Sequence, residues 1–212
     1  ALPLTIDVIN SAALDRQLVI SGSTVDAVSA LLPSFSPTRE KLSGAGESLR
    51  GQSPLYAIYG IPQSTPVRDG SRDGYTIDPF FIDRVEVIYG SNALQGIGAT
   101  GGVVNQVTVG APGEDGVAID ALAQITLPNG FDGEGIGAKS GALLGYRAGA
   151  FDASFGATVE RRGAFFDGAG NRIGVAGTQG EIQDSDSWSL FARLGYDLPT
   201  GARLELVANR FE

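Results

Sequence analysis

The stretch Glu86-Val-Ile-Tyr-Gly-Ser-Asn-Ala-Leu-Gln-Gly-Ile-Gly-Ala-Thr-Gly-Gly-Val-Val-Asn-Gln-Val-Thr-Val109 decides how this sequence folds. β-Branched and aromatic residues at its two ends are typical of strands. The glycines between Gly90 and Gly102 are typical of a bend. The stretch therefore predicts two strands joined by a glycine-rich bend, and it comes just before a long region with a different periodicity.

The residues upstream of this stretch mix helical and strand patterns. Asn10 or Ser11 can cap the first helical pattern and Ser23 or Thr24 the second, which Pro33 ends. A polar loop joins two of the strand-like runs. This mixture indicates a compact α+β unit over residues 1–112, with helices at 12–17 and 25–32 and strands at 4–9, 55–59, 84–89 and 103–109.

Beyond Gly113, apolar and polar residues alternate with a period of two, which is typical of strands with one apolar face. Tight turns are expected at 149–150 and 199–201, and long loops at 128–140 and 167–186. Short turns at one end and long loops at the other are typical of outer-membrane barrels. The pattern predicts strands at 117–127, 142–148, 151–159, 188–198 and 202–208.

This alternation leaves two architectures open. A soluble antiparallel sandwich turns its apolar face inward, whereas a membrane barrel turns it towards lipid. In a barrel, aromatic side chains form girdles at both interfaces. Trp188, Phe165 and Phe166 would lie near the outer rim, and Phe151, Tyr146 and Tyr196 near the inner rim.

Composition excludes several functions. The 212 residues carry a net charge of −9, which disfavours a phosphate-binding surface and so a nucleic-acid partner. There is no cysteine and no histidine, which excludes disulfides, thiolate nucleophiles and imidazole metal sites within these residues. No segment is long and apolar enough for a transmembrane helix, and no signal peptide opens the sequence. We expect a processed or excised piece of a longer protein.

Together with Ser48-Leu-Arg-Gly51, Leu55-Tyr-Ala-Ile-Tyr-Gly-Ile-Pro62 and Ile82-Asp-Arg-Val-Glu-Val87, the quoted stretch resembles the plug domain of TonB-dependent outer-membrane receptors. The resemblance covers essentially the whole sequence. It implies an α+β plug domain over 1–112, followed over 113–212 by antiparallel β-strands of an incomplete transmembrane β-barrel. Five strands cannot close a barrel, because bacterial outer-membrane barrels use at least about 8. We therefore expect most of the wall to lie outside this sequence.

The resemblance implies a transporter of the bacterial outer membrane, surrounded by its lipid, and not an enzyme. Such a receptor imports a ferric siderophore or a similar chelate, with energy from the TonB complex of the inner membrane. The TonB box is not visible at the N-terminus. Alternatives are a receptor for another scarce nutrient, such as cobalamin or a glycan, a surface-binding scaffold without energised transport, and a soluble β-rich binding module.

The same resemblance suggests two groups of functional residues. Plug loops that face outward capture the ligand, which points here to Gln63, Ser64, Arg68, Arg72 and Tyr75. The arginines would meet anionic oxygens of the chelate, and Tyr75 would stack or donate a hydrogen bond. Ion pairing between plug and barrel would use Arg50, Arg84 and Glu86. The family often has Arg-Gly-Pro where this sequence has Tyr89-Gly-Ser91, so one customary arginine is absent.

Other motifs have simpler explanations. Gly96-Ile-Gly-Ala-Thr-Gly101 matches a dinucleotide fingerprint, but a β-branched strand follows where a helix is needed. Asp69-Gly-Ser-Arg-Asp-Gly74 begins like a calcium loop, yet its twelfth position is Phe80 instead of glutamate. Asp78, Asp83 and Glu86 have no obvious nucleophile beside them and are expected to form ion pairs. We expect no catalytic residue, metal site or cofactor.

Overall fold

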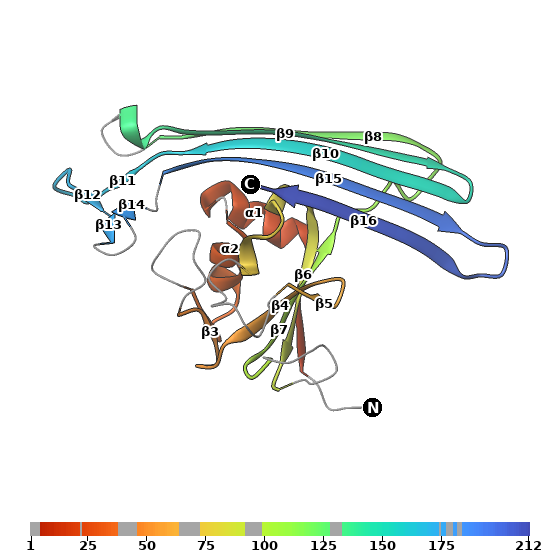
Figure 1. The fold of residues 1–212 in the computed structure, drawn as a ribbon, viewed down its shortest axis with the longest axis horizontal. Coiled ribbons are helices and arrows are strands. Elements are labelled where there is room, and N and C mark those ends of the chain that lie inside the picture. Colours follow the sequence, from red (N-terminus) through yellow and green to blue (C-terminus); the bar gives the residue numbers. More distant parts are fainter. Residues whose placement is uncertain are drawn as a thin grey trace. The chain divides into compact units, whose positions relative to one another are not determined.

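The computed structural model describes residues 5–21, 23–37, 46–63, 73–91, 99–127, 133–173, 175–176, 180–181 and 184–212. The chain divides into two compact units, Ala1–Thr108 and Val109–Glu212 (Figure 1). Each unit has its own sheet.

The first unit is built on a sheet with the strand order β1-β6-β7-β4-β5. The two strand-like runs on either side of the glycine-rich bend form β6 (Ile82–Tyr89) and β7 (Gly102–Thr108), which pair antiparallel. Next to β7 lies β4 (Pro54–Ile58), which runs parallel to it. The sheet is completed by β1 (Ile6–Ile9) and β5 (Ile61–Pro62), and a separate short ladder joins β2 (Phe35–Ser36) to β3 (Ser48–Leu49).

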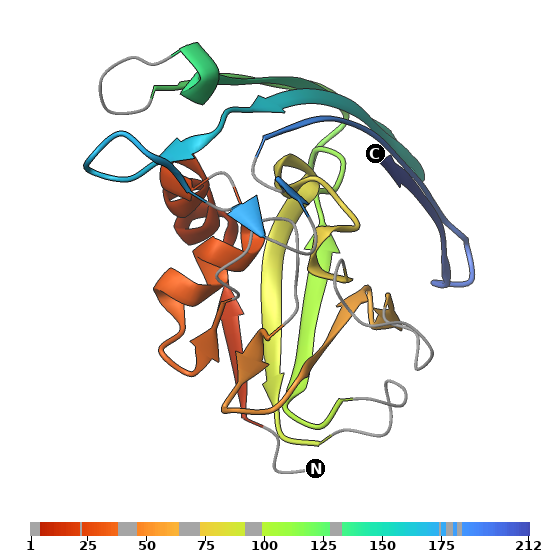
Figure 2. The ribbon, with the colours of Figure 1, turned by 60° about the vertical axis from the view of Figure 1, so that its left-hand side comes forward.

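Two helices lie beside this sheet, α1 (Ser11–Ser21) and α2 (Thr24–Leu31) (Figure 2). Asn10 Oδ1 accepts a hydrogen bond from Ala13 N at 3.0 Å, and Ser23 Oγ accepts one from Asp26 N at 3.5 Å. These side chains satisfy N–H groups that have no partner in the first turn of a helix. In the part of the chain that the structure describes, no helix is both long and apolar enough to cross a membrane.

Two short 3₁₀ helices, η1 (Asp73–Tyr75) and η2 (Pro79–Phe81), precede β6. Asp78 caps η2, because its Oδ1 accepts from Phe80 N at 2.9 Å. Phe81 then packs into the core, where it is fully buried. Asp78 has other contacts besides this cap, and its expected ion pairing stays a prediction.

The bend before β7 requires glycine at two positions. A Cβ on Gly101 would lie 2.6 Å from Gln52 O, which is too close for any side chain. Gly102 has a φ of +131°, and a Cβ there would overlap Ile88 O and approach Leu49 Cδ2 to 2.9 Å. Glycine alone adopts this conformation without strain and permits this backbone approach. The two glycines thus allow β7 to enter the sheet between β6 and β4.

The second unit is an antiparallel sheet with the order β16-β15-β10-β9-β8. Its tight turns at 149–150 and 199–201 are those predicted. The predicted loop 128–140 was too long, because its last four residues, Gly137–Ser140, continue the alternating pattern into β9. The strands are β8 (Gly116–Thr126), β9 (Gly137–Ala148), β10 (Phe151–Arg162), β15 (Ser185–Asp197) and β16 (Arg203–Phe211).

The long connection between β10 and β15 contains short strands that periodicity did not predict. They form two small hairpins. In the first hairpin, Asp167 Oδ1 accepts from the backbone N–H groups of Ala169 and Asn171 at 2.9 and 2.8 Å. Runs of two residues are too short to show a period. The hairpins are β11 (Phe165–Phe166) with β12 (Arg172–Ile173), and β13 (Val175–Ala176) with β14 (Gly180–Glu181). Between β8 and β9 lies η4 (Gly133–Gly135).

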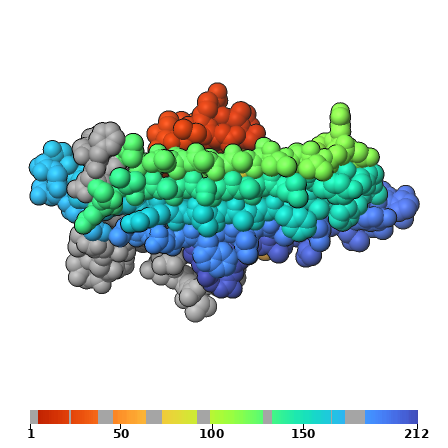
Figure 3. Space-filling view, turned by 90° about the horizontal axis from the view of Figure 1, so that it is seen from above, coloured from red at the N-terminus to blue at the C-terminus, as the bar shows by residue number. Residues whose placement is uncertain are grey.

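The sheet of the second unit has one apolar face, and that face is exposed. Ile119 is 72% exposed, Ile125 71% and Leu206 62%. The strand register places apolar side chains in rows across the sheet, and the strands lie side by side (Figure 3). Soluble monomers rarely expose a contiguous apolar surface of this kind. One row of apolar cross-strand neighbours on this face consists of Val117, Tyr146, Ala153, Leu194 and Leu206.

Aromatic side chains gather on this face at the end where the tight turns lie. The rings of Tyr146 and Phe151 are 6.5 Å apart, and Phe151 is the cross-strand partner of Tyr196. Trp188 lies towards the opposite end of the sheet, where it pairs with Val159. This arrangement agrees with the positions expected from the sequence, while the role of these residues as membrane girdles stays a prediction.

Candidate functional site

Tyr56 in β4 connects the two described segments that flank the predicted ligand loop. Gln63 N donates to Tyr56 O at 2.9 Å. On the other side, Gly74 of η1 lies against the Tyr56 ring, since a Cβ there would be 3.1 Å from Tyr56 Cζ and from Val25 Cγ2. The backbone of Gln63 therefore pairs with that of Tyr56, and Gly74, which precedes Tyr75, packs against the Tyr56 ring. Ser64, Arg68 and Arg72 lie outside the described residues.

A buried acid–phenol pair lies beneath η1. Tyr56 Oη donates to Glu47 Oε2 at 2.5 Å, and Glu47 is only 5% exposed. Burial raises the pKa of the Glu47 carboxyl to about 7 against the effect of the Tyr56 hydrogen bond, and the negative charges of Asp26 and Asp73 add to the rise. Burial, followed by the charge of Glu47, raises the pKa of Tyr56 well above its usual range. This pair was not found from the sequence.

The environment of Glu47 explains why its charge is disfavoured. Glu47 Oε1 and Thr24 Oγ1 are both buried, and neither has a hydrogen-bond partner among the described residues. A carboxylate in such a place has lost water on one oxygen without replacement, which favours its protonated form. A single glutamate that precedes Ser48-Leu49 gives no sign of this in the sequence, because only the tertiary packing of β4, α2 and η1 buries it.

A chain of polar contacts holds the turn from which the ligand loop begins. Asn105 Oδ1 accepts from Gly60 N at 2.7 Å, and Asn105 Nδ2 donates to Glu86 Oε2 at 2.9 Å. Tyr59, with a φ of +51°, and Gly60 form the tight turn between β4 and β5. The Tyr59 hydroxyl is 2.6 Å from Thr108 Oγ1. Side chains of β7 therefore fix the backbone just before Gln63.

Arg84 and Glu86 pair with each other in the structure. Arg84 Nε donates to Glu86 Oε1 at 2.9 Å, and Arg84 also contacts Asp83 at 3.3 Å. The hydrogen bond from Arg84 to Glu86 raises the pKa of Arg84. Both side chains are partly exposed, and their suggested pairing with the barrel wall stays a prediction. The expected ion pair of Asp83 with Arg84 is present.

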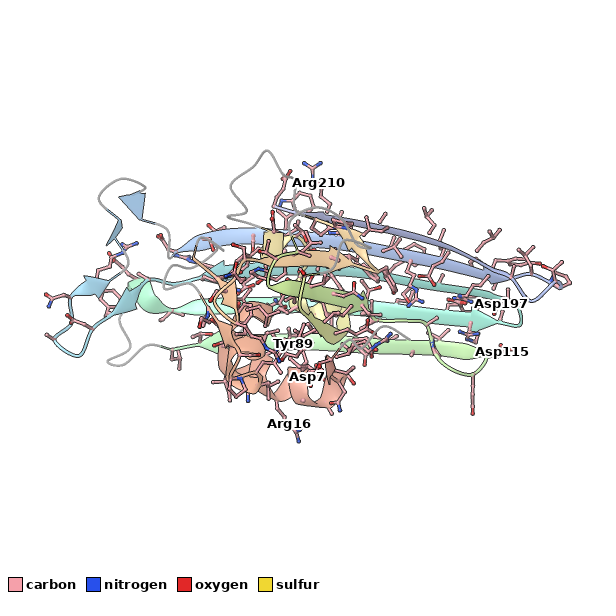
Figure 4. All side chains as sticks on the ribbon, turned by 90° about the horizontal axis from the view of Figure 1, so that it is seen from below. Asp7, Arg16, Tyr89, Asp115, Asp197 and Arg210 are labelled. Carbon is pink, nitrogen blue, oxygen red and sulfur yellow. The ribbon has the colours of Figure 1, made fainter. Side chains whose placement is uncertain are left out.

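Tyr89 occupies the position of the absent arginine and ties together three parts of the first unit. Its hydroxyl donates to Asp7 Oδ2 of β1 at 2.7 Å and lies 3.0 Å from Ser34 Oγ (Figure 4). The Arg50 guanidinium lies 4.2 Å from the centre of the Tyr89 ring, which is a cation–π contact. Arg50 N donates to Ser34 O at 2.8 Å. Arg50 thus has a partner that the sequence did not suggest.

Within the described residues, no group of three or more acidic, cysteine or histidine side chains is placed to hold a metal ion. The arrangement around Tyr56 is a scaffold for a loop. The groups in this arrangement act through hydrogen bonds and charge, and the acid–phenol pair of Glu47 and Tyr56 is buried.

Comparison with known proteins adds the family. Residues 1–103 match the family model described as TonB-dependent Receptor Plug Domain. The rhizobactin receptor of Rhizobium meliloti is 30% identical over 196 residues, which cover 91% of this chain and 26% of that protein. The ferric aerobactin receptor of Klebsiella pneumoniae is 27% identical over 207 residues, 97% of this chain and 27% of that protein.

Solved structures show the same fold at lower identity. The siderophore receptor PirA from Pseudomonas aeruginosa has a TM-score of 0.67 and 16% identity, over 96% of this chain and 34% of its own. A variant of the ferric enterobactin receptor PfeA from the same organism has a TM-score of 0.71 and 19% identity, over 96% of this chain and 32% of its own.

These findings, with the plug-like first unit and the apolar-faced sheet, define the class: a plug domain followed by barrel strands. Residues 1–103 belong to the plug domains of TonB-dependent receptors, and most of the chain is similar in sequence to the receptor for rhizobactin. The chain spans about a quarter of the length of the curated relatives it matches, which are 26% and 27% covered.

Proposed function

We propose that the chain is part of an outer-membrane transporter that imports a ferric siderophore with energy from TonB. The observation that carries this proposal is the plug match over residues 1–103 in a chain whose curated relatives are receptors for rhizobactin and ferric aerobactin. In this proposal, residues 1–112 form the plug domain, and residues 113–212 form strands of the barrel wall with lipid against their apolar face.

The test is uptake of radioactive iron by cells that carry the full-length receptor and lack their own siderophore receptors. Ferric aerobactin and ferric rhizobactin are the expected substrates, with ferric enterobactin and cobalamin as comparisons. Uptake must stop when TonB is deleted. Binding of a chelate without TonB-dependent uptake would favour a surface-binding scaffold, and uptake of cobalamin alone would remove the siderophore assignment.

We also propose that Gln63, Ser64, Arg68, Arg72 and Tyr75 contact the chelate. Support comes from two contacts of Tyr56, one between its backbone and Gln63 and one between its ring and Gly74 next to Tyr75. The charge of the two arginines also suits anionic chelate oxygens. We predict that Arg68→Ala with Arg72→Ala weakens binding, because each charge-assisted hydrogen bond contributes about 1.5–3 kcal/mol.

The measurement is equilibrium binding of each ferric chelate to the purified full receptor. The matched control is Arg16→Ala, an exposed arginine on α1 that we expect to leave the affinity unchanged. If the double variant binds the whole panel as tightly as the unmodified receptor, the two arginines do not belong to the site.

A further inference from the structure

The linker Val109–Asp115 between β7 and β8 is held by side chains of the second unit. Arg193 Nη1 from β15 donates to Val109 O at 3.2 Å, and Arg147 Nε from β9 donates to Pro112 O at 2.5 Å. At the end of the linker, Asp115 Oδ1 accepts from Gly149 N at 2.9 Å, in the turn between β9 and β10. Three contacts from different elements therefore fasten seven residues.

Both arginines are themselves oriented by carboxylates. Arg193 Nη2 donates to Glu205 Oε2 at 2.7 Å, and Arg147 Nη2 lies 3.6 Å from Asp152 Oδ2. Asp152, whose side chain is 2% exposed, also accepts from Arg203 at 2.6 Å. A guanidinium held in this way has already lost side-chain freedom, so little further entropy is lost when it binds a carbonyl oxygen. The carbonyl contacts are thus preorganised.

Glycines make room for these contacts. A Cβ on Gly145 would lie 2.9 Å from Pro112 Cδ, so any larger residue in this part of β9 would push the linker away. A Cβ on Gly110 would be 3.1 Å from Arg193 Nη1. A Cβ on Gly195 would overlap the Arg203 guanidinium and come within 2.8 Å of Asp152 Oδ1. The absence of side chains at these glycines therefore lets the linker and the arginines approach the sheet closely.

We propose that Arg147, Arg193 and Asp115 form a linker clamp that fixes the end of the plug chain to the barrel wall while the plug rearranges. This inference rests on the proposed function. A pull on the N-terminal side of the plug produces tension only if the other end is held. A released linker of seven residues would add up to about 25 Å of slack, at roughly 3.3–3.6 Å per extended residue. The three residues are positioning residues for transport.

The first experiment measures linker mobility in the full receptor, without substrate or TonB. A nitroxide is placed on Glu114→Cys, an exposed position, and the described chain offers no other cysteine. We expect a restricted spectrum in the parent protein and loss of that restriction with Arg147→Ala and Arg193→Ala together. The matched control is Arg161→Ala, an exposed arginine near the far end of β10. An equally restricted label in the double variant would overturn the proposal.

Two further variants distinguish loss of the linker contacts from misfolding of the receptor. Lysine at both positions keeps the charge and several donors, so Arg147→Lys with Arg193→Lys should retain part of the restriction. Asp115→Ala keeps the ion pairs of Arg147 and Arg193 with their carboxylates. It should therefore loosen only the last residues of the linker. Parent-like restriction in Asp115→Ala would overturn the part of the proposal that concerns this residue.

The second experiment separates binding from transport. Iron uptake is measured against chelate concentration in cells that carry the parent, alanine and lysine receptors. We expect a lower maximal rate for the alanine variant, an unchanged affinity for the external chelate, and partial rescue by lysine. A maximal rate equal to that of the parent would overturn the role in transport. If even the parent receptor imports no iron, the proposed function fails, while the mobility result still decides whether the clamp exists.

Discussion

At the scale of the residue, Glu47 is the side chain whose properties depend most on folding. The pKa of its carboxyl rises from an ordinary 4.5 to about 7, because burial disfavours the charge and the nearby Asp26 and Asp73 disfavour it further. At a pH between these two values, the Glu47 carboxyl keeps its proton in the folded plug and loses it in the unfolded chain. Stability from this group is complete below about pH 4.5 and is lost as the pH rises through 7.

We predict that Glu47→Gln removes this pH dependence. The amide oxygen still accepts from Tyr56 and carries no charge, so the plug should be more stable than the parent at pH 8, by up to roughly 3 kcal/mol from the size of the pKa shift, and nearly unchanged at pH 5. The measurement is hydrogen exchange of β4 in the full receptor, corrected for the intrinsic effect of pH. Glu114→Gln, at an exposed position, is the control. A parent that opens with the same free energy at both pH values contradicts the prediction.

At the scale of the element, β1 is an edge strand fastened at more than its ladder. It pairs only with β6 among the described strands, and Tyr89 adds a hydrogen bond to Asp7. An edge strand of four residues has few contacts of its own, so a single hydrogen bond to a carboxylate is a large part of its attachment. Tyr89 therefore influences when β1 leaves the sheet.

We predict that Tyr89→Phe loosens β1 without disturbing β4. The ring and its contact with Arg50 remain, while the bonds to Asp7 and Ser34 are lost, so local opening of β1 should become easier by about 1–3 kcal/mol. Hydrogen exchange of residues 6–9 in the full receptor measures this. Tyr59→Phe, which removes a hydroxyl near Thr108 instead, should leave β1 as it is. Equal protection of β1 in Tyr89→Phe and the parent would rule out the attachment.

At the scale of the whole molecule, the question is whether the exposed apolar face of the second unit contacts water or lipid. Leu190 lies midway along β15 and is 52% exposed. Its row across the sheet contains Ala121, Ala142 and Ala157, and ends at Arg210 of β16. In water, a change at such an exposed position alters stability by only about 0.5 kcal/mol. In lipid, a lysine at the bilayer midplane costs about 2–4 kcal/mol.

We therefore predict that Leu190→Lys destabilises the full receptor by about 2–4 kcal/mol in lipid vesicles. Asp120→Lys, at a similar height on the opposite face of β8, should have a much smaller effect. Reversible unfolding in urea with vesicles present measures both. Similar, small effects of the two substitutions would mean that the apolar face does not contact lipid.

Much of this architecture could be predicted from local patterns. The period of two gave the strands of the second unit to within a few residues, and the β-branched runs around the glycines gave β6 and β7. Periodicity failed where elements are too short to show it, as in β2, β3 and the hairpins β11 to β14. It also placed the start of β9 too late, because Gly137-Ala-Lys-Ser140 looks like a polar loop until pairing with β8 and β10 is known.

Less of the candidate site could be predicted from the sequence. Arg50, Arg84 and Glu86 were chosen for ion pairing, yet the contacts of Arg50 with Tyr89, and of Glu86 with Asn105, join residues far apart in the chain. Arg68 and Arg72 lie outside the described residues, so their role as ligand contacts stays a prediction.

Local periodicity and short motifs are enough to predict the α+β character of the first unit, the alternating strands of the second and the resemblance to TonB-dependent receptors. The burial of Glu47 against Tyr56, the bond from Tyr89 to β1 and the bonds from two arginines to the linker follow only from the folded structure. Burial and long-range hydrogen bonds arise when distant segments pack together, and no local pattern records which segments those are.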